Sequence, residues 1–199
     1  MLELVILRHG EPVGGPKYRG QTDDPLSEHG WRQMQAAVHG HGPWQQVVSS
    51  LLRRCLAFAG DLAARQNITI VTDPRLREIS FGAWEGMTVM QVKAAYSQSW
   101  HDFYQNPVLN TPPVAEPLPV FQRRVHEALQ ALIGRHREGK ILLVAHAGVI
   151  RMSLNHLLGF PLERTFRIAV PYACMSRIGY HGNDHRSPSL LSHAAGPIP

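Results

Sequence analysis

The sequence predicts an α/β fold, a three-layer α/β/α sandwich in which helices cover both faces of a mainly parallel sheet. Two observations support this prediction. Residues 2–7 and 140–145 are nearly continuous apolar runs, which is the pattern of strands buried on both faces of a parallel sheet. Short β-rich runs also alternate along the chain with amphipathic stretches of helical period, the order expected for such layers.

The other elements follow from local patterns. Ser27 is a candidate N-cap for one helix, and Thr88 and Gln91 have the spacing of a capping box at the start of another. Pro117 and Pro119 stand where a long helix begins, since proline is favoured in the first turn. In chain order, the patterns predict a helix at 27–39, a strand at 46–49, a helix at 52–65, a strand at 68–72, a helix near 88–97, a long helix from 117, a helix at 148–158 and a strand at 173–180.

A single domain over residues 1–199 fits the chain length. The tail at 181–199 is rich in Gly, Pro, Ser and His, and we expect it to be loosely ordered. No apolar run approaches the roughly 18 residues of a membrane span, and the first residues lack the basic leader of a signal peptide. We therefore expect a cytoplasmic protein that does not bind membranes.

The charge balance indicates a small anionic ligand. The formal net charge is +5 and the pI about 9.6, but the basic residues are scattered without a Lys/Arg run or interleaved aromatics. A nucleic-acid partner is therefore not expected. Cys55 and Cys174 lie far apart without CxxC spacing, which predicts two reduced thiols and neither a disulfide framework nor a zinc site.

A histidine follows each of the two apolar strands, His9 after the first and His146 after the second. In open α/β sheets the ligand site lies at the carboxyl ends of the strands, so both rings should meet there if the strands are parallel and central. A neutral imidazole can attack phosphorus, provided that an acceptor holds its other ring nitrogen. Arg8 offers a planar cation for phosphate oxygens, and Gly10 is expected to allow close approach of the ligand.

Several segments resemble the histidine phosphatase, or phosphoglycerate-mutase-like, superfamily, and the resemblance runs from about residue 4 to residue 177. They occur in order and at suitable distances, which makes the set specific although each segment alone is weak. The segments are LRHGE at 7–11, DPLSEHG at 24–30, SSLLRRC at 49–55, LREISFGAWEG at 76–86 and VAHAGVIR at 144–151.

The resemblance implies a role for each matching position. His9 resembles the nucleophile that becomes phosphohistidine, and Arg8 and Arg54 resemble the cationic clamp on the phosphate. His146 is similar to the second pocket histidine, which donates to phosphoryl oxygens. Glu78 resembles the general acid that protonates the leaving oxygen and then helps to activate water.

Some positions leave alternatives open. Glu85 is a rival to Glu78 as the acid. Many family members carry an Asn shortly after the first motif, whereas 12–16 here reads PVGGP. Backbone N–H groups of this glycine-rich turn, or the side chain of Gln21, could supply the missing phosphate contact, and Gly148 is a further predicted phosphate-binding position. Ala147 stands where the family frequently has Gly.

The short chain and the FGxWEG pattern resemble the phosphatase branch of the family. This resemblance implies a metal-independent phosphatase of the acid type that needs no cofactor and releases inorganic phosphate from a small phosphorylated substrate. Residues 100–125 and 166–168 are similar to α-ribazole phosphatase, so α-ribazole 5'-phosphate is one candidate substrate. The alternatives are a cofactor-dependent phosphoglycerate mutase and a non-catalytic protein that binds a phosphorylated ligand.

Overall fold

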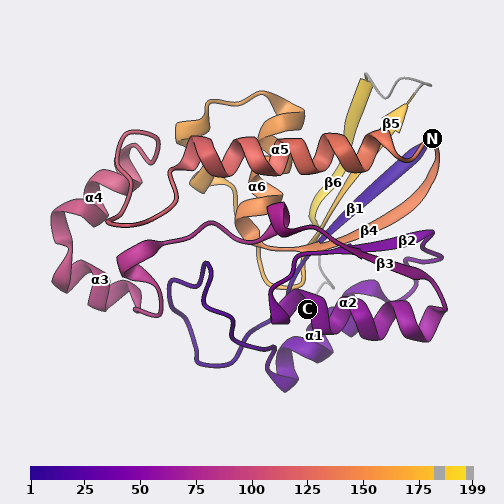
Figure 1. The fold of residues 1–199 in the computed structure, drawn as a ribbon, viewed down its shortest axis with the longest axis horizontal. Helices are drawn as coiled ribbons and strands as arrows, with labels where there is room; N and C mark the ends of the chain where they lie inside the picture. Colours follow the sequence, from indigo (N-terminus) through magenta and orange to yellow (C-terminus); the bar gives the residue numbers. More distant parts are fainter. Residues whose placement is uncertain (182–186, 196–199) are drawn as a thin grey trace.

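The computed structural model describes residues 1–181 and 187–195, and its six strands form one sheet (Figure 1). The strands are β1 (Leu2–Arg8), β2 (Gln46–Ser49), β3 (Thr69–Thr72), β4 (Gly139–Ala145), β5 (Met175–His181) and β6 (Ser187–Ala195). Their order in the sheet is β3-β2-β4-β1-β5-β6. The first four are mutually parallel, whereas β5 runs antiparallel to β1 and β6 antiparallel to β5. The predicted α/β fold with a mainly parallel sheet is confirmed.

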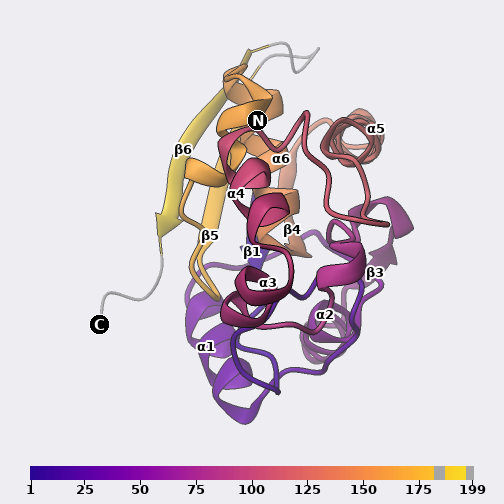
Figure 2. The same ribbon diagram turned by 90° about the vertical axis from the view of Figure 1, so that its left-hand side faces the viewer.

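Helices cover both faces of the sheet. They are α1 (Glu28–Val38), α2 (Arg53–Gln66), α3 (Val89–Ala95), α4 (Ser97–Gln105), α5 (Leu118–Gly134) and α6 (Ala147–Leu158), with short 3₁₀ segments at Pro74–Leu76, Gly82–Trp84 and Leu162–Arg167. Helices α5 and α6 lie on one face, and α1 and α2 on the other (Figures 1 and 2). Within the described ranges, no helix combines the length and the apolar character that crossing a bilayer requires.

The central strand β1 shows why the apolar runs are continuous. Its side chains alternate between the faces, and both faces carry helices. Leu4 and Ile6 join the core beneath α5 and α6, whereas Val5 and Leu7 join the core beneath α1 and α2. All four are at most 1% exposed, so this strand has no solvated face that would favour polar residues.

The predicted helix starts are present. The Ser27 hydroxyl accepts a hydrogen bond from the backbone N–H of Gly30 at 3.0 Å and so caps α1. Thr88 and Gln91 form the reciprocal capping box of α3. The helix predicted near 88–97 is shorter than expected, because the backbone of Tyr96 leaves the helical region at φ −136°.

A second helix, α4, follows Tyr96, and the sequence patterns did not predict it. Its only buried residue is Phe103, which packs at 5.5 Å (ring centroids) against the fully buried Trp84. The contact that orders α4 is therefore made with a distant part of the chain. Helices α3 and α4 lie beyond the end of the sheet at which β1 and β4 finish (Figures 1 and 2).

The expectation of a loosely ordered tail is wrong for much of its length. Residues Ser187–Ala195 form β6, which pairs antiparallel with β5. Strand β5 presents an edge to which a further strand can bind through backbone hydrogen bonds. Because these bonds use backbone groups, the side-chain composition of residues 187–195 gave little indication of a strand. Pro188 fits because β6 is the last strand of the sheet, where proline is tolerated. Residues 182–186 and 196–199 lie outside the described part of the chain.

The structure gives a packing reason for glycine at position 10, in addition to the close approach of a ligand that the sequence predicts. A Cβ atom at this position would lie 2.2 Å from the carbonyl oxygen of Gly30, and a Cβ at Gly30 would lie 2.1 Å from that of Glu11. The missing side chains therefore let α1 approach the backbone that follows β1. Gly10 therefore accommodates the close packing of α1, and its role toward a ligand stays a prediction.

Candidate active site

The two histidines meet at the carboxyl edge of the sheet, as the strand arrangement predicts. Strands β1 and β4 are parallel neighbours in which Arg8 is in register with Ala145. The backbone N–H of His9 donates to the Ala145 carbonyl at 3.0 Å, so the next residue of each strand is also adjacent. The ring centroids of His9 and His146 lie 5.2 Å apart in an edge-on arrangement.

His9 is held as a neutral ring with a defined free nitrogen. Its Nδ1 lies 2.8 Å from the Gly10 carbonyl oxygen, which can only accept, so Nδ1 carries the proton and Nε2 is left with a lone pair. Burial lowers the pKa of His9 well below its usual value, and the positive charges of Arg54 and Arg8 lower it further. The ring is therefore a candidate nucleophile at neutral pH.

His146 is completely buried beside His9. Its Nε2 lies 2.8 Å from the Ser50 hydroxyl, and the Cys55 sulfur lies 3.6 Å from the same nitrogen. Burial, followed by the charge of Arg54, lowers the pKa of His146 well below its usual value. This ring is thus neutral as well, and the Ser50 hydroxyl fixes its orientation.

Two arginines surround the histidines without a carboxylate partner. Arg8 donates to the Val170 carbonyl, its guanidinium carbon lies 4.0 Å from the ring centroid of Tyr172, and its Nε is buried without a partner. Arg54 is fully buried and donates at 2.8 Å to the carbonyl oxygens of Gly20 and Thr22. No ion pair of the described residues involves either guanidinium. Cations without an ion-pair partner, one fully buried and one partly buried, favour an anion between them.

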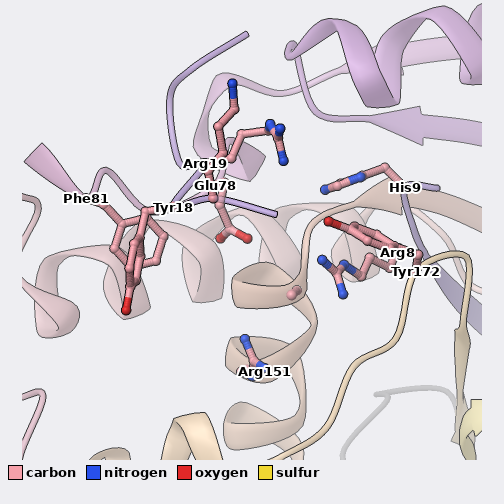
Figure 3. Close-up of a pocket in the computed structure, with 10 residues that line it drawn as sticks. Arg8, His9, Tyr18, Arg19, Glu78, Phe81, Arg151 and Tyr172 are labelled. Carbon is pink, nitrogen blue, oxygen red and sulfur yellow. The ribbon is translucent and has the colours of Figure 1, made fainter. Parts of the chain in front are cut away.

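The Glu78 side chain lines the same cavity and is 7% exposed. Its Oε1 accepts from the backbone N–H of Ile79 and its Oε2 from that of Gly148, both at 3.0 Å. Figure 3 shows the carboxylate directed into the space between His9 and Arg151. The N–H of Gly148 is therefore engaged by Glu78 in this structure, although a phosphate contact is predicted for it.

The rival carboxylate, Glu85, is engaged in holding a loop. It accepts hydrogen bonds from the backbone N–H groups of Gly20, Gln21, Thr22 and Phe81 and from the Thr22 hydroxyl. Burial alone would raise its pKa, but these hydrogen bonds, that from the Thr22 hydroxyl first, outweigh burial and leave the pKa of Glu85 lowered. A carboxylate that stays ionised and is fully hydrogen-bonded is a poor general acid.

The structure does not bring Gln21 into the cavity with the histidines. Its side-chain amide donates to the backbone carbonyl of Glu78, and the residue lines a separate hollow with Arg75, Arg77 and Arg124. The loop before it, not Gln21 itself, reaches the cavity. Lys17 and Arg19 line the wall there and share Asp24, each at 2.8 Å.

Arg124 holds the backbone that carries Glu78. It forms a bidentate ion pair with Glu116, with its Nε and Nη2 at 2.7 and 2.8 Å from the two carboxylate oxygens. Its remaining N–H groups donate to the carbonyl oxygens of Arg75, Arg77 and Glu78. All five donors of this guanidinium are therefore used to fix the segment that ends at the candidate acid.

The cavity has a volume of about 160 Å³, and several of its lining residues escaped the sequence analysis. They are Lys17, Tyr18, Arg19, Arg151 and Tyr172. Two signals in the sequence could have indicated some of them. Lys17 and Arg19 follow shortly after the PVGGP segment at 12–16, and Arg151 has helical spacing from Ala147. Nothing in the local sequence distinguishes Tyr172. Within the described part of the chain, no three His, Cys, Asp or Glu side chains are arranged to hold a metal ion.

Comparison with known proteins agrees with this geometry. The family model described as "Histidine phosphatase superfamily (branch 1)" matches residues 4–191. The chain belongs to the histidine phosphatase superfamily. A curated relative from Yersinia pestis, named probable phosphoglycerate mutase, is 30% identical over 98% of this chain and 93% of its own length.

Solved structures of the superfamily match nearly the whole chain. A mycobacterial glucosyl-3-phosphoglycerate phosphatase is 27% identical, with a TM-score of 0.86 over 98% of this chain and 99% of that one, and it has also been solved with inorganic phosphate. The α-ribazole phosphatase of Shigella flexneri has a TM-score of 0.83 over 97% of this chain and 96% of that one. At 24% identity, this second likeness bears on the fold alone.

Proposed function

We propose that the chain is a phosphomonoesterase that hydrolyses a small phosphorylated metabolite through a phosphohistidine at Nε2 of His9. The observation that carries the proposal is the hydrogen bond between Nδ1 of His9 and the Gly10 carbonyl. It leaves Nε2 unprotonated beside Arg8, which lines the same cavity, and within the electrostatic influence of the fully buried Arg54, which is not among the residues that line it. A nucleophile and a receptor for the transferring group thus stand together.

In the first half-reaction, Nε2 of His9 attacks phosphorus and the ester P–O bond breaks. The leaving oxygen takes a proton from the Glu78 carboxyl group, which becomes a carboxylate. In the second half-reaction, this carboxylate removes a proton from water, and the water oxygen attacks the phosphohistidine. The P–N bond breaks, inorganic phosphate leaves, and His9 returns as the neutral imidazole.

The remaining groups stabilise charge on the phosphoryl oxygens. Arg8 and Arg54 supply fixed positive charge, and His146 supplies a ring oriented by Ser50. A phosphoryl group in transfer spreads negative charge over its three equatorial oxygens, so preorganised donors act where the charge develops.

Hydrolysis is favoured over the two alternatives. The mycobacterial phosphatase supports hydrolysis by its fold and by its 27% identity, whereas the name of the Yersinia relative favours phosphoglycerate mutation. Release of inorganic phosphate from p-nitrophenyl phosphate, compared with 2,3-bisphosphoglycerate-dependent isomerisation of phosphoglycerate, separates the two. A purely phosphate-binding protein would need no leaving-group acid, yet Glu78 lies in the cavity with His9.

Replacing the nucleophile tests the proposal directly. His9→Ala should abolish both turnover of p-nitrophenyl phosphate and acid-labile labelling of the protein by substrate phosphate. His39→Ala, at an exposed histidine remote from the cavity, is the matched control and should retain both. Labelling that persists in His9→Ala would assign the covalent intermediate to another residue.

The identity of the natural substrate stays a prediction. A panel of phosphomonoesters that includes α-ribazole 5'-phosphate would test the candidate named by the sequence resemblance. Selective turnover of that ester, by a factor of at least about 100 in kcat/KM over p-nitrophenyl phosphate, is the result that would support it.

A further inference from the structure

The cavity wall beside His9 carries a tyrosine, Tyr172, that the proposed phosphoryl-transfer chemistry does not use. Its ring centroid lies 5.8 Å from that of His9, and both residues line the cavity. The guanidinium carbon of Arg8 lies 4.0 Å from the Tyr172 ring centroid, which is a cation–π distance. Figure 3 shows the Tyr172 hydroxyl and the His9 ring directed toward the same part of the cavity.

A strained turn holds Tyr172 at this place. The backbone N–H of Cys174 donates to the Pro171 carbonyl at 3.3 Å, and Ala173, the third residue of this turn, has φ 53°. That position favours glycine, because side chains disfavour the left-handed region. The N–H of Ala173 donates to the His9 carbonyl at 3.3 Å, so the turn is joined to the backbone of the nucleophile. Backbone strain of this kind is concentrated at functional sites.

The hydroxyl of Tyr172 is uncommitted, whereas the other tyrosine of the cavity wall is engaged. The hydroxyl of Tyr18, which also lines the cavity, lies 3.1 Å from that of Tyr104 and accepts a hydrogen bond from Nε1 of Trp100 at 2.7 Å. The Tyr172 hydroxyl has no hydrogen-bond partner among the residues that the structure describes. A phenolic O–H in this situation is available to donate to a ligand.

Two other neutral donors, which the sequence predicts for the phosphate, are engaged elsewhere. The backbone N–H of Gly148 donates to Oε2 of Glu78 at 3.0 Å. The side-chain amide of Gln21 donates to the backbone carbonyl of Glu78. Neither group is therefore free for a phosphoryl oxygen in this structure, whereas the hydroxyl of Tyr172 is.

We propose that the Tyr172 hydroxyl donates a hydrogen bond to an oxygen of the phosphoryl group as this group passes to and from Nε2 of His9. A preorganised donor of this kind acts where negative charge develops. The Tyr172 ring also packs on the Arg8 guanidinium, so one side chain contacts the phosphoryl group and orients a cation that binds it. The inference rests on the proposed function, because it adds a catalytic residue to that same site.

Removing the hydroxyl alone tests this contact. Tyr172→Phe keeps the ring over Arg8 and should lower kcat/KM roughly 10- to 100-fold, because one donor to the developing charge is lost. The hydroxyl contacts the phosphoryl group and not the leaving oxygen, so p-nitrophenyl phosphate and propyl phosphate should lose rate by the same factor, to within about threefold. Tyr172→Leu also removes the ring from Arg8 and should lose more.

A matched control removes a hydroxyl elsewhere. Tyr96→Phe alters a tyrosine between α3 and α4 that does not line the cavity, and it should keep the wild-type rates. The midpoint of urea unfolding should be the same in Tyr172→Phe as in the wild type, whereas calorimetry should show binding of inorganic phosphate that is weaker by about 10-fold. An unchanged kcat/KM in Tyr172→Phe would overturn the proposal. So would a loss confined to propyl phosphate, because it would assign the hydroxyl to the leaving oxygen.

The binding measurement also separates failure of this proposal from failure of the proposed function. If wild-type protein releases no phosphate from p-nitrophenyl phosphate while Tyr172→Phe weakens phosphate binding, the hydrolytic function is wrong and the Tyr172 contact stands. If turnover occurs and Tyr172→Phe changes neither kcat/KM nor the affinity for phosphate, only the Tyr172 contact is wrong.

Discussion

At the scale of single residues, one hydrogen bond determines what His9 can do. The Gly10 carbonyl oxygen can only accept a hydrogen bond, so Nδ1 must carry the proton and Nε2 the free lone pair. The surrounding burial and the two arginine charges then keep the ring unprotonated. Tautomer and charge are thus set by different neighbours, and both favour nucleophilic attack.

The pH dependence of the rate should reflect this environment. Because the pKa of His9 is lowered, protonation should not remove the nucleophile near the usual histidine pKa of about 6.5. We expect the His9-dependent part of kcat/KM for p-nitrophenyl phosphate to be retained through this pH and to decline only at lower values. A pH–rate profile measures this. The expectation would be contradicted by a loss of activity centred near pH about 6.5 that remains when the surface histidines are replaced.

The same shifts affect stability with a definite sign. His9 and His146 have lower pKa values folded than unfolded, so below pH about 6.5 the unfolded chain binds more protons. Their contribution is fully present above that pH and is lost as pH falls toward the folded pKa values. The free energy of unfolding, followed by denaturant titration, should therefore decrease in this window, with a shallower slope in His146→Gln.

At the scale of elements, the segment before Glu78 depends on a side chain from α5. Arg124 contributes every one of its donors to Glu116 and to three carbonyl oxygens of residues 75–78. Lysine has three donors and no planar fork, so it cannot replace this set. Arg124 is thus a positioning residue for the candidate acid, although it does not line the cavity itself.

Arg124→Lys should impair acid catalysis more than binding. We expect kcat for propyl phosphate to fall roughly 10- to 100-fold, because a misplaced acid cannot protonate a poor leaving group, with a smaller change in KM. Turnover of p-nitrophenyl phosphate, whose leaving group needs little protonation, should fall much less. The adjacent exposed Arg123→Lys serves as control, and equal losses on both substrates would indicate a general loss of structure instead.

Elements defined by their own residues were predicted well, and those defined by distant contacts were not. The Ser27 cap and the Thr88–Gln91 box are local, and the sequence identified both. Helix α4 depends on the packing of Phe103 against Trp84, and β6 depends on the free edge of β5. Neither contact leaves a signal in the short segment that it orders.

The candidate site divides in the same way. Parallel strands that each end in histidine predict the meeting of His9 and His146, and the structure confirms it. Other residues that line the cavity were harder to predict. Lys17 reaches it from a loop whose course the sequence does not reveal, and Arg151 reaches it from one face of α6. Gln21 shows the converse, because a suitable side chain in a suitable loop is directed elsewhere by the Glu78 carbonyl.

At the scale of the whole molecule, the fold gathers its cations from separate layers. Arg8 ends the central strand β1, Arg54 lies in the first turn of α2 on one face, and Arg151 lies on α6 on the other face. All three approach one end of the sheet. Under the proposed function, these side chains would supply the positive charge that a transferring phosphoryl group requires.

Chelation should accordingly leave the reaction intact. We expect activity toward p-nitrophenyl phosphate to be the same before and after dialysis against EDTA, because guanidinium and imidazole groups perform the charge stabilisation that Mg²⁺ supplies in other phosphoryl transfers. A loss of activity that added divalent metal restores would contradict this mechanism.

The loop at residues 20–22 has a consequence for how firmly Arg54 is oriented. The N–H groups of Gly20, Gln21 and Thr22 donate to Glu85, and the carbonyl oxygens of Gly20 and Thr22 accept from Arg54. The loop thus lies between a carboxylate and a guanidinium, which form no direct ion pair among the described residues. Peptide oxygens do not titrate as a carboxylate would. The carbonyl oxygens that orient the Arg54 guanidinium are therefore not protonated in acid. The orientation of Arg54, and its ability to bind an anion, should persist at every pH at which the protein stays folded.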